Sequence, residues 1–432
     1  MRPTQLMEMS RKIIILLMGL RITTGLCAQS APIISQIVWI GNDVTKDYVI
    51  QREIHHPIGV PLDSVLAQED RNRLDNLGIF SEVMWQVVPQ PDGTETLQYL
   101  VVESWRYMPG LAPVYEEAFG WSLSGGLIVN NFRGRNETLL VGGSIGANNT
   151  FSVNYSNPWL TGDHLSLDLE MGSKRVSHLF LPYNEESLFL GGKWGRYSGY
   201  THKFKMAAEV YQSQYLSNVS ADIHYTLLEL QGSYGYDTRD IYLEPTQGVY
   251  LHTTLGSRIF KNHTPQWIWE QFFSVFHQLA GTNKRPLVLA GNVDWNGIMG
   301  FKEAVWLNYL GGSYTVRGFA IPDARLYQSG LHTERFGYVQ MYGSMELRKV
   351  VIPRHATSTR NEFGLTIVLF ADEGITGDDL DTLTDGTLLF AVGGGIRIPF
   401  PILQEVCLEM GWGNKSGIWT RPNYFFRFGP KF

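Results

Sequence analysis

The sequence contains few charged residues and no long hydrophobic run. Asp, Glu, Lys and Arg make up 18% of its 432 residues, whereas ordinary soluble domains contain roughly 25%. The longest apolar runs, at residues 13–20 and 365–371, are far shorter than the roughly 18 residues that a membrane-spanning helix needs. The net charge of −6 gives no sign of a basic surface for nucleic acid. These absences exclude a helical membrane protein and argue against nucleic acid as a partner.

Aromatic residues and glycine are abundant instead. Aromatic side chains account for 13% of the residues, and 45 residues are glycine, which is about 10% against a usual 7% or so. A disordered chain would be poor in aromatic residues and rich in charge. This composition favours a protein of many short strands, and a β-barrel in a membrane is a fold of that kind.

The N-terminus has the pattern of a secretory signal. A basic start, an apolar core at residues 13–20 and a small-x-small site at residues 28–30 predict a cleaved signal peptide over residues 1–30. An apolar N-terminal helix is the alternative. After cleavage, Cys407 is the one cysteine left, so no internal disulfide is expected even in an oxidising compartment.

Residues 33–104 predict a small α+β domain. An apolar run at residues 33–40 predicts a first strand, and Thr45 is expected to cap a helix that carries Val49, Ile50 and Ile54. A second helix is expected to end at Gly78, a residue that suits the left-handed conformation after a helix. Two strands joined by a Pro-Asp-Gly turn complete the domain.

This order of strand, helix, helix, strand and strand resembles a POTRA domain, a periplasmic module that binds polypeptides. The Gly78-Ile79-Phe80 corner and Glu103 at the end of the last strand fit that family. On the residues alone, a generic α+β domain is the alternative.

The pattern changes after this domain. Residues 105–118 predict a linker, because Pro109, Gly110 and Pro113 interrupt any regular pattern. From Phe119 to Phe432, apolar and polar residues alternate with a period of two, in segments long enough for spanning strands of ~9–11 residues. We distinguish 16 such segments, and single-chain bacterial barrels require an even number.

A transmembrane barrel explains this alternation without any long apolar run. In lipid, every backbone polar group must find its partner within the sheet. The expected fold is therefore a 16-stranded antiparallel transmembrane β-barrel over residues 119–432, preceded by one α+β domain. A soluble β-sandwich has the same period and is the alternative. The last strand, interrupted by Pro430, is expected to carry four aromatic residues on one face: Tyr424, Phe426, Phe428 and Phe432. A terminal aromatic residue of this kind resembles the sorting signal of outer-membrane barrels.

The most specific segment spans residues 310–319. There a glycine pair is followed closely by Val316, Arg317, Gly318 and Phe319. This arrangement is the hallmark of the BamA-type outer-membrane assembly and translocation superfamily, also called bacterial surface antigens, and the sequence resembles that family over nearly the whole mature chain. Further motifs of the family follow in the expected order, at residues 131–135, 155–159, 236–240, 245–248, 343–348 and 370–374. The resemblance implies a barrel in the outer membrane of a Gram-negative-type bacterium, with the POTRA domain in the periplasm.

In that family the arginine-containing loop folds back into the barrel, and its arginine is held by acidic groups on the wall. By motif position these acids are Glu346 and Asp372. The alternation of residues supports an inward position for both, because Glu346 shares a phase with Ser344, and Asp372 shares one with Thr366. An arginine between two carboxylates can form charge-assisted, bidentate hydrogen bonds. The alternative is that both acids are ordinary charges facing the lumen.

The function implied by the resemblance is not catalysis. Client strands are thought to pair at a seam between the first and last strands, where unmet backbone groups can accept another strand. The seam is expected at Gly125, Gly126, Pro430 and Phe432, because glycine weakens a strand and proline removes a hydrogen bond. A bend in the barrel and a frayed terminus are the alternative. POTRA domains are thought to receive clients by edge addition as well, here at residues 81–88.

The expected partners follow from this role. They are the outer-membrane bilayer, unfolded outer-membrane or secreted client proteins, and in addition periplasmic chaperones and assembly lipoproteins, without nucleic acid. Two other functions stay open. A dedicated exporter of one partner protein usually has two POTRA domains and a plug helix, or else a lipase passenger. A passive porin would not need a POTRA domain or the motif at residues 316–319.

Three other patterns suggest chemistry but do not predict a catalytic, cofactor or metal site. Residues 142–146 match the hydrolase pattern G-x-S-x-G around Ser144, which requires a strand-to-helix elbow, and no helix is expected there. His55 and His56 lack a second pair of ligands at metal spacing. Residues 372–385 contain six carboxylates but not the spacing of an EF-hand loop.

Overall fold

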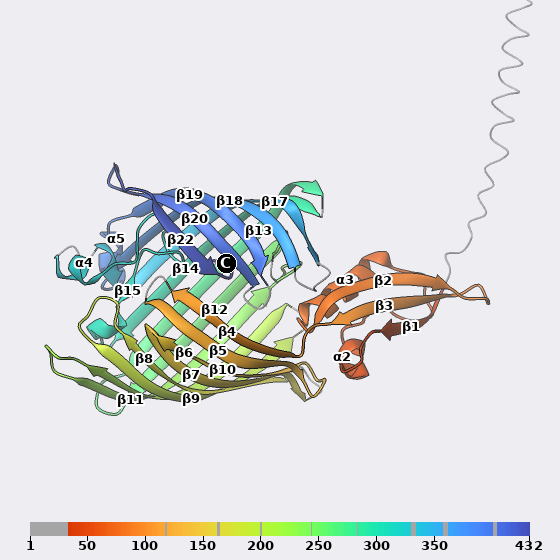
Figure 1. Cartoon of the computed structure of the whole chain (residues 1–432), viewed down its shortest axis with the longest axis horizontal. Coiled ribbons are helices and arrows are strands. Elements are labelled where there is room, and N and C mark those ends of the chain that lie inside the picture. Colours follow the sequence, from red (N-terminus) through yellow and green to blue (C-terminus); the bar gives the residue numbers. More distant parts are fainter. Residues whose placement is uncertain are drawn as a thin grey trace, which may run out of the picture.

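The structure is a computed structural model of the whole chain (Figure 1). It describes residues 33–116, 119–161, 165–198, 201–242, 244–282, 284–329, 334–356, 362–400 and 404–432. The signal peptide expected at residues 1–30 lies outside the described residues. Two parts of unequal size are visible: a small N-terminal domain (residues 33–104) and a barrel. We call the end of the barrel that faces the N-terminal domain the proximal end, and the opposite end the distal end.

The N-terminal domain has the order of elements that the sequence predicts. It consists of β1 (Ile34–Ile40), α2 (Asp47–Gln51), α3 (Ser64–Asn76), β2 (Phe80–Pro89) and β3 (Glu95–Glu103). The strands form one sheet in the order β1-β3-β2, in which β1 is parallel to β3 and β2 is antiparallel to it. A core that includes Ile50, Leu74 and Tyr99 joins the helices to one face of this sheet.

One detail of this domain differs from the expectation. Thr45 does not cap α2, and Ile54 lies beyond the end of that helix. The residue before α2 is Lys46, which makes no side-chain cap, whereas the Thr45 hydroxyl donates to Glu103 Oε1 at the end of β3. The carboxylate of Glu103 competes for the hydroxyl because it also accepts from the backbone N–H of Thr45, 2.6 Å away, and charge-assisted bonds are the stronger ones.

A buried carboxylate ties α3 to the sheet. Asp70 accepts hydrogen bonds from the backbone N–H groups of His55 (2.9 Å) and His56 (3.0 Å) and from the Tyr99 hydroxyl (2.9 Å). Burial, together with the nearby Asp70 carboxylate, raises the pKa of the Tyr99 hydroxyl. These bonds satisfy polar groups that would otherwise be costly to bury.

The second part is a barrel of antiparallel strands that follow one another around the sheet in chain order. The first eleven are β4 (Tyr107–Glu116), β5 (Gly120–Phe132), β6 (Glu137–Gly146), β7 (Asn148–Thr161), β8 (Leu165–Ser177), β9 (Asn184–Ser198), β10 (His202–Leu216), β11 (Ile223–Asp237), β12 (Gly248–Phe260), β13 (Gln266–Thr282) and β14 (Arg285–Gly300). The others are β17 (Val339–Ala356), β18 (Glu362–Gly377), β19 (Leu389–Phe400), β20 (Gln404–Lys415), β21 (Ile418–Trp419) and β22 (Asn423–Phe428). Because β21 and β22 both pair with β20, they are two pieces of one strand, and the barrel has 16 strands as predicted. Fifteen of them lie within residues 119–432, where the sequence analysis expected all 16, and β4 is the other.

The barrel begins earlier than the sequence suggested, so the linker expected at residues 105–118 is wrong. Residues Tyr107–Glu116 form β4, which pairs with β5 over its whole length. Pro109 and Pro113 suggested a linker, because proline has no backbone N–H to donate to a neighbouring strand. An edge strand tolerates proline when the missing N–H faces away from its partner, and β4 is the strand at which the barrel closes.

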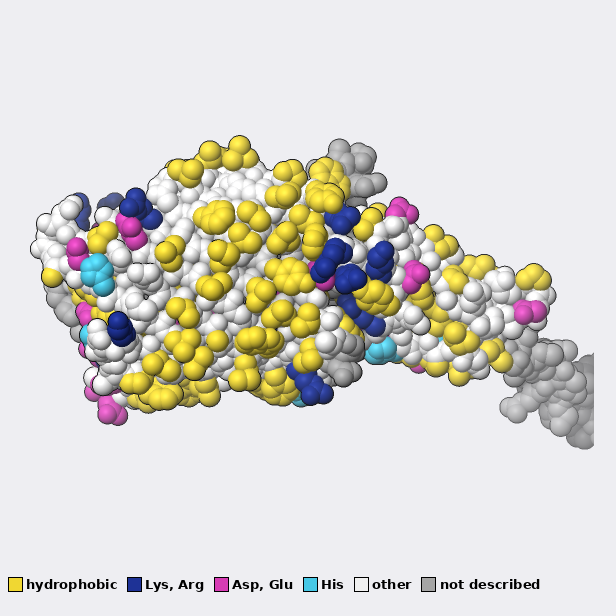
Figure 2. Space-filling model, turned by 90° about the horizontal axis from the view of Figure 1, so that it is seen from below, with side chains coloured by type: hydrophobic (Ala, Val, Ile, Leu, Met, Phe, Trp, Pro, Cys, Tyr) yellow, Lys and Arg dark blue, Asp and Glu magenta, His cyan; other side chains and the backbone are white. Residues whose placement is uncertain are grey.

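Side chains alternate between the two faces of the barrel strands. Outward positions are apolar, as on β8, where Leu165, Leu169 and Met171 are exposed, while inward positions such as Ser166 are buried and polar. Figure 2 shows hydrophobic side chains spread over the outer face of the barrel, and Lys and Arg side chains gathered between the barrel and the N-terminal domain. An apolar outside around a polar inside is the pattern of a transmembrane barrel.

The end of the chain departs from the expected pattern. Tyr424 lies on the outer face and is 77% exposed, but Phe432 is buried against Phe276 inside the barrel, with 6.2 Å between ring centroids. The prediction that Phe432 shares a face with the aromatic residues of β22 is therefore wrong. The strand ends at Phe428, and Gly429 follows with a φ of 80°, a left-handed conformation that turns the chain inward.

The distal end carries the long connection between β14 and β17. This connection contains η1 (Ala304–Trp306), β15 (Asn308–Tyr309), α4 (Ala324–Gln328) and β16 (Phe336–Gly337), and β15 pairs with β16. A short helix, α5 (Leu380–Thr384), joins β18 to β19. None of the helices in the described part of the chain is long and apolar enough to cross a membrane.

Candidate functional site

The segment from Gly311 to Phe319 folds back into the barrel and turns sharply. Gly311, Gly312 and Gly318 have φ values of 125°, 90° and 137°, which lie in the region that side chains rarely adopt. At Gly318 a Cβ atom would lie 2.6 Å from the backbone nitrogen of Gly413 on the barrel wall. The glycines of the motif are therefore required both for the turn and for the close approach of the loop to the wall.

Arg317 is the centre of this loop and is fully buried. Its Nε and Nη2 atoms donate to the two oxygens of Asp372, at 2.8 Å each, and its backbone N–H donates to the same carboxylate at 2.9 Å. Nη1 donates to Glu346 Oε1 at 2.7 Å. The structure thus brings together the arginine and the two acids that the sequence singled out. The guanidinium also lies 3.7 Å from the ring centroid of Phe370, as in a cation–π contact.

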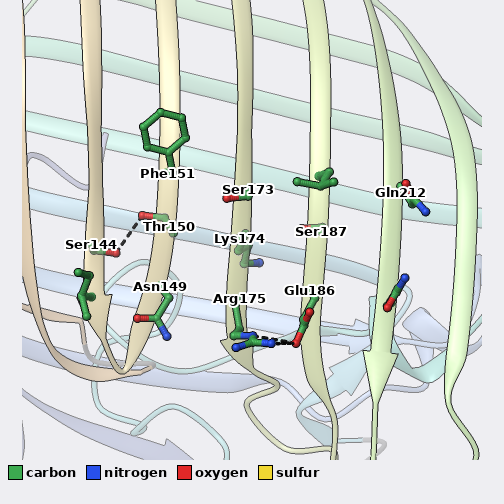
Figure 3. Close-up of a pocket in the computed structure, with 13 residues that line it drawn as sticks. Ser144, Asn149, Thr150, Phe151, Ser173, Lys174, Arg175, Glu186, Ser187 and Gln212 are labelled. Carbon is green, nitrogen blue, oxygen red and sulfur yellow. Dashed lines mark hydrogen bonds and ion pairs between the residues drawn. The ribbon is translucent and has the colours of Figure 1, made fainter.

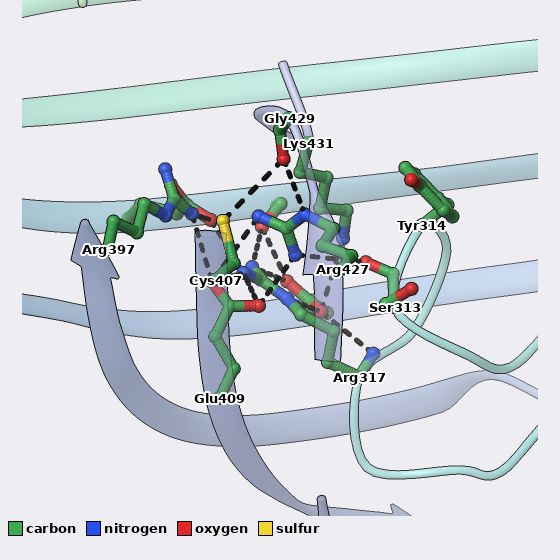
Figure 4. Close-up of polar contacts among 12 residues, drawn as sticks. Ser313, Tyr314, Arg317, Arg397, Cys407, Glu409, Arg427, Gly429 and Lys431 are labelled. Atoms are coloured by element: carbon green, nitrogen blue, oxygen red, sulfur yellow. Dashed lines mark hydrogen bonds and ion pairs between the residues drawn. The ribbon is translucent and has the colours of Figure 1, made fainter. Parts of the chain in front are cut away.

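The cluster extends beyond the three residues considered from sequence (Figure 4). Glu409 on β20 accepts from Arg317 Nη1 at 3.1 Å and from Arg427 Nη1 at 2.7 Å. Arg397 Nη2 donates to Glu346 and Glu409 at 2.7 and 3.1 Å. A buried carboxylate with several cationic partners is one whose removal leaves uncompensated charge. The cluster as a whole contains five cations and four acids: Arg317, Arg348, Arg397, Arg427 and Lys431 with Glu346, Asp372, Glu405 and Glu409.

The sequence contained a signal for these additional residues. On β20, Glu405, Cys407 and Glu409 alternate with Val406, Leu408 and Met410, so both acids fall in the inward phase. The alternation identifies inward acids, but it does not show which of them reach Arg317. That depends on the path of the loop across the barrel.

The loop also bonds to the last strand and to the chain end. Gly318 O accepts from Asn423 Nδ2 at 2.7 Å and from Thr420 Oγ1 at 3.1 Å. Arg427 Nη1 donates to Ser313 O at 3.4 Å, and Lys431 Nζ donates to Thr315 O. Lys431 also pairs with Asp372 at 3.2 Å. The loop inside the barrel is therefore hydrogen-bonded to β22 and to the residues that follow this strand.

The position of the seam differs from the expectation at Gly125 and Gly126. These glycines lie in β5, the second strand, and pair with β4 on one side and β6 on the other. The strands that meet at the seam are β4 and β22. The barrel closes between these two strands, and because β22 has six residues whereas β4 has ten, their pairing can cover only part of β4. Pro430 follows β22, and Phe432 points into the barrel, so neither belongs to a strand at this seam.

β2 is one of the two edge strands of the N-terminal domain, and β1 is the other, because β3 lies between them in the sheet. Residues 81–88, which the sequence proposed for edge addition, lie within β2. A strand could be added at the outer edge of β2, and also at the part of β4 that extends beyond β22.

The patterns that suggested other chemistry have structural explanations. Ser144 lies inside β6, where its hydroxyl donates to Asn148 O at 2.7 Å, and it lines a hollow with Thr150, Lys174 and Glu186 (Figure 3). The His56 ring accepts from the Asp63 backbone N–H at 2.9 Å. Asp379 forms a capping box with Thr382 at α5. No group of three or more potential metal ligands is found in the part of the chain that the structure describes.

Comparison with known proteins agrees with this geometry. Residues 131–412 match the Omp85 superfamily domain, and residues 32–104 match the POTRA family described as surface antigen variable number repeat. The outer membrane protein assembly factor BamA of Neisseria meningitidis serogroup B is 25% identical over 145 residues, which are 33% of this chain and 18% of that protein. The chain thus matches less than a fifth of the length of this curated relative.

Solved structures share the fold at low sequence identity. BamA from Haemophilus ducreyi lacking POTRA domains 1–3 has a TM-score of 0.57 and 16% identity, and the match covers 92% of this chain and 84% of that one. CdiB from Escherichia coli has a TM-score of 0.59 and 13% identity, with coverage of 92% and 76%. CdiB from Acinetobacter baumannii has a TM-score of 0.51 and 15% identity, with coverage of 92% and 73%.

Proposed function

We propose that this chain, which belongs to the Omp85 superfamily, assembles other proteins into the outer membrane or moves them across it. The barrel lies in the outer membrane, and the POTRA domain at its proximal end lies in the periplasm. The proposed role is mechanical rather than enzymatic: client strands are received at the β2 edge and at the seam.

The observation that carries this proposal is the seam between β4 and β22. The barrel closes between β22 and β4, which are neighbours in the sheet. Because β22 has six residues and β4 has ten, the pairing between them can cover only part of β4. Unpaired backbone groups at a strand edge are a template for another strand, and edge addition is a known mode of peptide recognition. β4 also continues directly from the POTRA domain, because only Ser104, Trp105 and Arg106 separate it from β3.

The filled interior supports this role over that of a passive porin. The loop at residues 311–319 is held inside the barrel by buried charge, and Leu310, Val316 and Phe319 pack against Leu389 and Ala391 of β19. A porin keeps a water-filled channel. A loop that fills the barrel and is hydrogen-bonded to β22 is better suited to stabilising one side of the seam than to letting small solutes pass.

The test is depletion of the protein in its host, followed by quantitative proteomics of the outer membrane. Loss of many unrelated barrel proteins is the expected result and identifies a general assembly factor. Loss of a single secreted or surface protein would instead identify a dedicated exporter and its client. A change in small-solute uptake alone would overturn the proposal and favour a porin.

The same proposal includes partners other than the client proteins. Periplasmic chaperones and assembly lipoproteins would bind the POTRA domain, whose outer faces extend away from the barrel (Figure 1). Affinity purification of the tagged full-length protein from cross-linked cells tests this point, because a chaperone or lipoprotein partner should be recovered with it. Recovery of neither class would contradict it.

A further inference from the structure

The POTRA domain contacts the first periplasmic turn of the barrel, which we define as residues 130–136, the end of β5 and the residues that lead to β6. Lys46 N donates to Gly134 O at 2.9 Å. Asn131 Nδ2 donates to Thr45 Oγ1 at 2.8 Å, and both of these side chains are buried. The two bonds join the loop before α2 to the centre of the turn.

Two further contacts lie on either side of this point. Asn130 Nδ2 donates to Gly78 O, at the corner between α3 and β2, with a distance of 3.2 Å. The guanidinium of Arg52 lies 4.2 Å from the ring centroid of Trp159 near the periplasmic end of β7, a cation–π geometry. Contacts from three separate parts of the domain fix an orientation, which a single contact cannot do.

The turn itself is built for close approach to the domain. Asn131, Arg133 and Asn136 have φ values of 50°, 59° and 59°, and Gly134 has 72°. Asn131 Oδ1 accepts from Asn136 N at 2.8 Å and thereby closes the turn on itself. A Cβ atom at Gly134 would lie only 2.2 Å from Val44 O of the POTRA domain. Any side chain at this position would push the domain away from the barrel.

The contact continues into the POTRA domain through Thr45. Its hydroxyl accepts from Asn131 and donates to Glu103, the last residue of β3. Glu103 also accepts from Val44 N at 3.1 Å. A continuous chain of hydrogen bonds therefore runs from the end of β3 to the barrel turn, and such networks act as units because each bond polarises the next.

The turn itself has a rigid base on the barrel. Arg133 binds Glu137 through two parallel bonds of 2.8 Å, and Asn157 donates to the same buried carboxylate at 3.3 Å. Asn157 also accepts from Trp159 N at 2.9 Å. The two motifs at residues 131–135 and 155–159 thus form one connected surface.

We propose that this surface, the first periplasmic turn together with Trp159, is a docking platform that fixes the orientation of the POTRA domain, and that Thr45, Asn131 and Gly134 are its positioning residues. The functional consequence rests on the proposed function: the docked domain holds the β2 edge at one set position relative to the seam. A domain released from the platform would remain attached through β4 alone. Its movements would then act directly on β4, the strand at which the barrel closes.

The test measures the orientation itself in the full-length protein in lipid bilayers. Spin labels at Val65→Cys in α3 and Lys284→Cys in the β13–β14 turn report the distance between the domain and the opposite wall, in a background with Cys27→Ser and Cys407→Ser. Both label sites are exposed. One narrow distance distribution is expected for the unaltered platform. Gly134→Ala is expected to lose that single peak and give a broad distribution.

Gly417→Ala is the matched control. Gly417 also has a positive φ, 88°, in a turn at the opposite end of the barrel, but a Cβ atom there meets nothing within 4 Å. The backbone strain is thus shared, and only the contact with the domain differs. A narrow distribution in Gly134→Ala would overturn the proposal, as would equal broadening in both variants.

A second variant covers the case in which Gly134→Ala fails to fold. Thr45→Val keeps the shape of the side chain but removes the hydroxyl between Asn131 and Glu103. It is expected to broaden the distribution while the barrel keeps its heat-dependent shift in gel mobility. An unchanged distribution in Thr45→Val would overturn the role of that residue.

A functional readout separates this inference from the proposed function. Client assembly in cells is expected to fall in Gly134→Ala and to stay normal in Gly417→Ala. Broadening without any loss of assembly would overturn the claim that docking serves client delivery. If the unaltered protein proved to assemble no client, the proposed function would fail, but the distance measurement would still decide whether the platform exists.

Discussion

The two sides of the seam are built in opposite ways. On one side, β22 is zipped to β20 and is bonded from within by the loop that contains Arg317. On the other side, β4 contains two prolines, is longer than the six-residue β22 beside it, and leads directly from the POTRA domain. We infer that one side of the seam is a fixed wall and the other is a movable edge.

The two sides of the seam differ in their charged side chains. Buried charges of the β22 side satisfy one another across the loop and five strands, β17 to β20 and β22, and such a network is costly to disturb. In β4, residues 107–114 contain no charged side chain, and the strand is paired with β5 over its whole length. The following predictions test this contrast, from the largest expected effect to the smallest.

Arg317→Glu should remove the fixed wall. It replaces the one cation that contacts Asp372, Glu346 and Glu409 together, and leaving buried charges uncompensated costs about 3–5 kcal/mol. We expect loss of client assembly and a lower free energy of unfolding, measured by urea titration in detergent micelles. Arg325→Glu, in the exposed helix α4, is the control. Normal client assembly and an unchanged free energy of unfolding in Arg317→Glu would mean that the contacts of Arg317 do not stabilise this side of the barrel.

Glu409→Gln should weaken the same wall by a smaller amount. The amide keeps the shape of the side chain but loses the charge that Arg317, Arg397 and Arg427 share. Hydrogen bonds to charged groups contribute about 1.5–3 kcal/mol, so the free energy of unfolding should fall by about 2 kcal/mol. Glu405→Gln is the control, because the Arg397 guanidinium is 3.9 Å from that carboxylate. Equal losses in both variants would contradict the special position of Glu409.

Pro109→Val combined with Pro113→Val should turn the movable edge into a fixed one. The two positions are four residues apart, so their backbone groups face the same edge of β4, and an edge proline has its missing N–H on the unpaired side. Two restored donors should favour zipping with β22 and raise stability by about 1 kcal/mol each. Client assembly should slow, as followed by the appearance of folded barrels in pulse-labelled cells. Faster assembly would show that an unzipped β4 does not serve client entry.

Ser144→Ala should have the smallest effect. It removes a hydrogen bond between β6 and β7, which are not strands of the seam, and such a bond contributes about 1 kcal/mol. Client assembly should therefore be normal in complementation of a depleted strain. A loss of function with a folded barrel would point to a role for the hollow around Ser144 that the seam does not explain.

The sequence predicted the structure best where residues alternate with a period of two and where a sharp turn requires glycine. Alternation along the chain predicted a barrel of 16 strands, although one of them, β4, lies before the range in which they were counted. It also predicted that Glu346 and Asp372 face inward, where the structure has them. The sequence was least informative at prolines. Pro109 and Pro113 indicated a linker, but a proline on an edge strand is compatible with pairing on the other side. Sequence cannot distinguish these cases, because which strand is at an edge is decided by the whole sheet.

The candidate site shows the same division. The spacing of the glycines and Arg317 identified the loop, but not its bonds to Asn423, Arg427 and Lys431, which come from residues about a hundred positions later in the chain. Phe432 was expected on the lipid face because the alternation of β22 was extended past Gly429. The positive φ at that glycine ends the alternation, and a period-two pattern contains no information about where a strand stops.

The sequence by itself determined the class of fold, the order of the domains and which residues face the interior, because these depend on local alternation and on glycine at sharp turns. Only the tertiary structure decided which strand begins the barrel, where the seam lies, and which charges meet at Arg317. Those features depend on contacts between residues far apart in the chain. The free energy of such a contact depends on burial and geometry, which exist only once the barrel has formed.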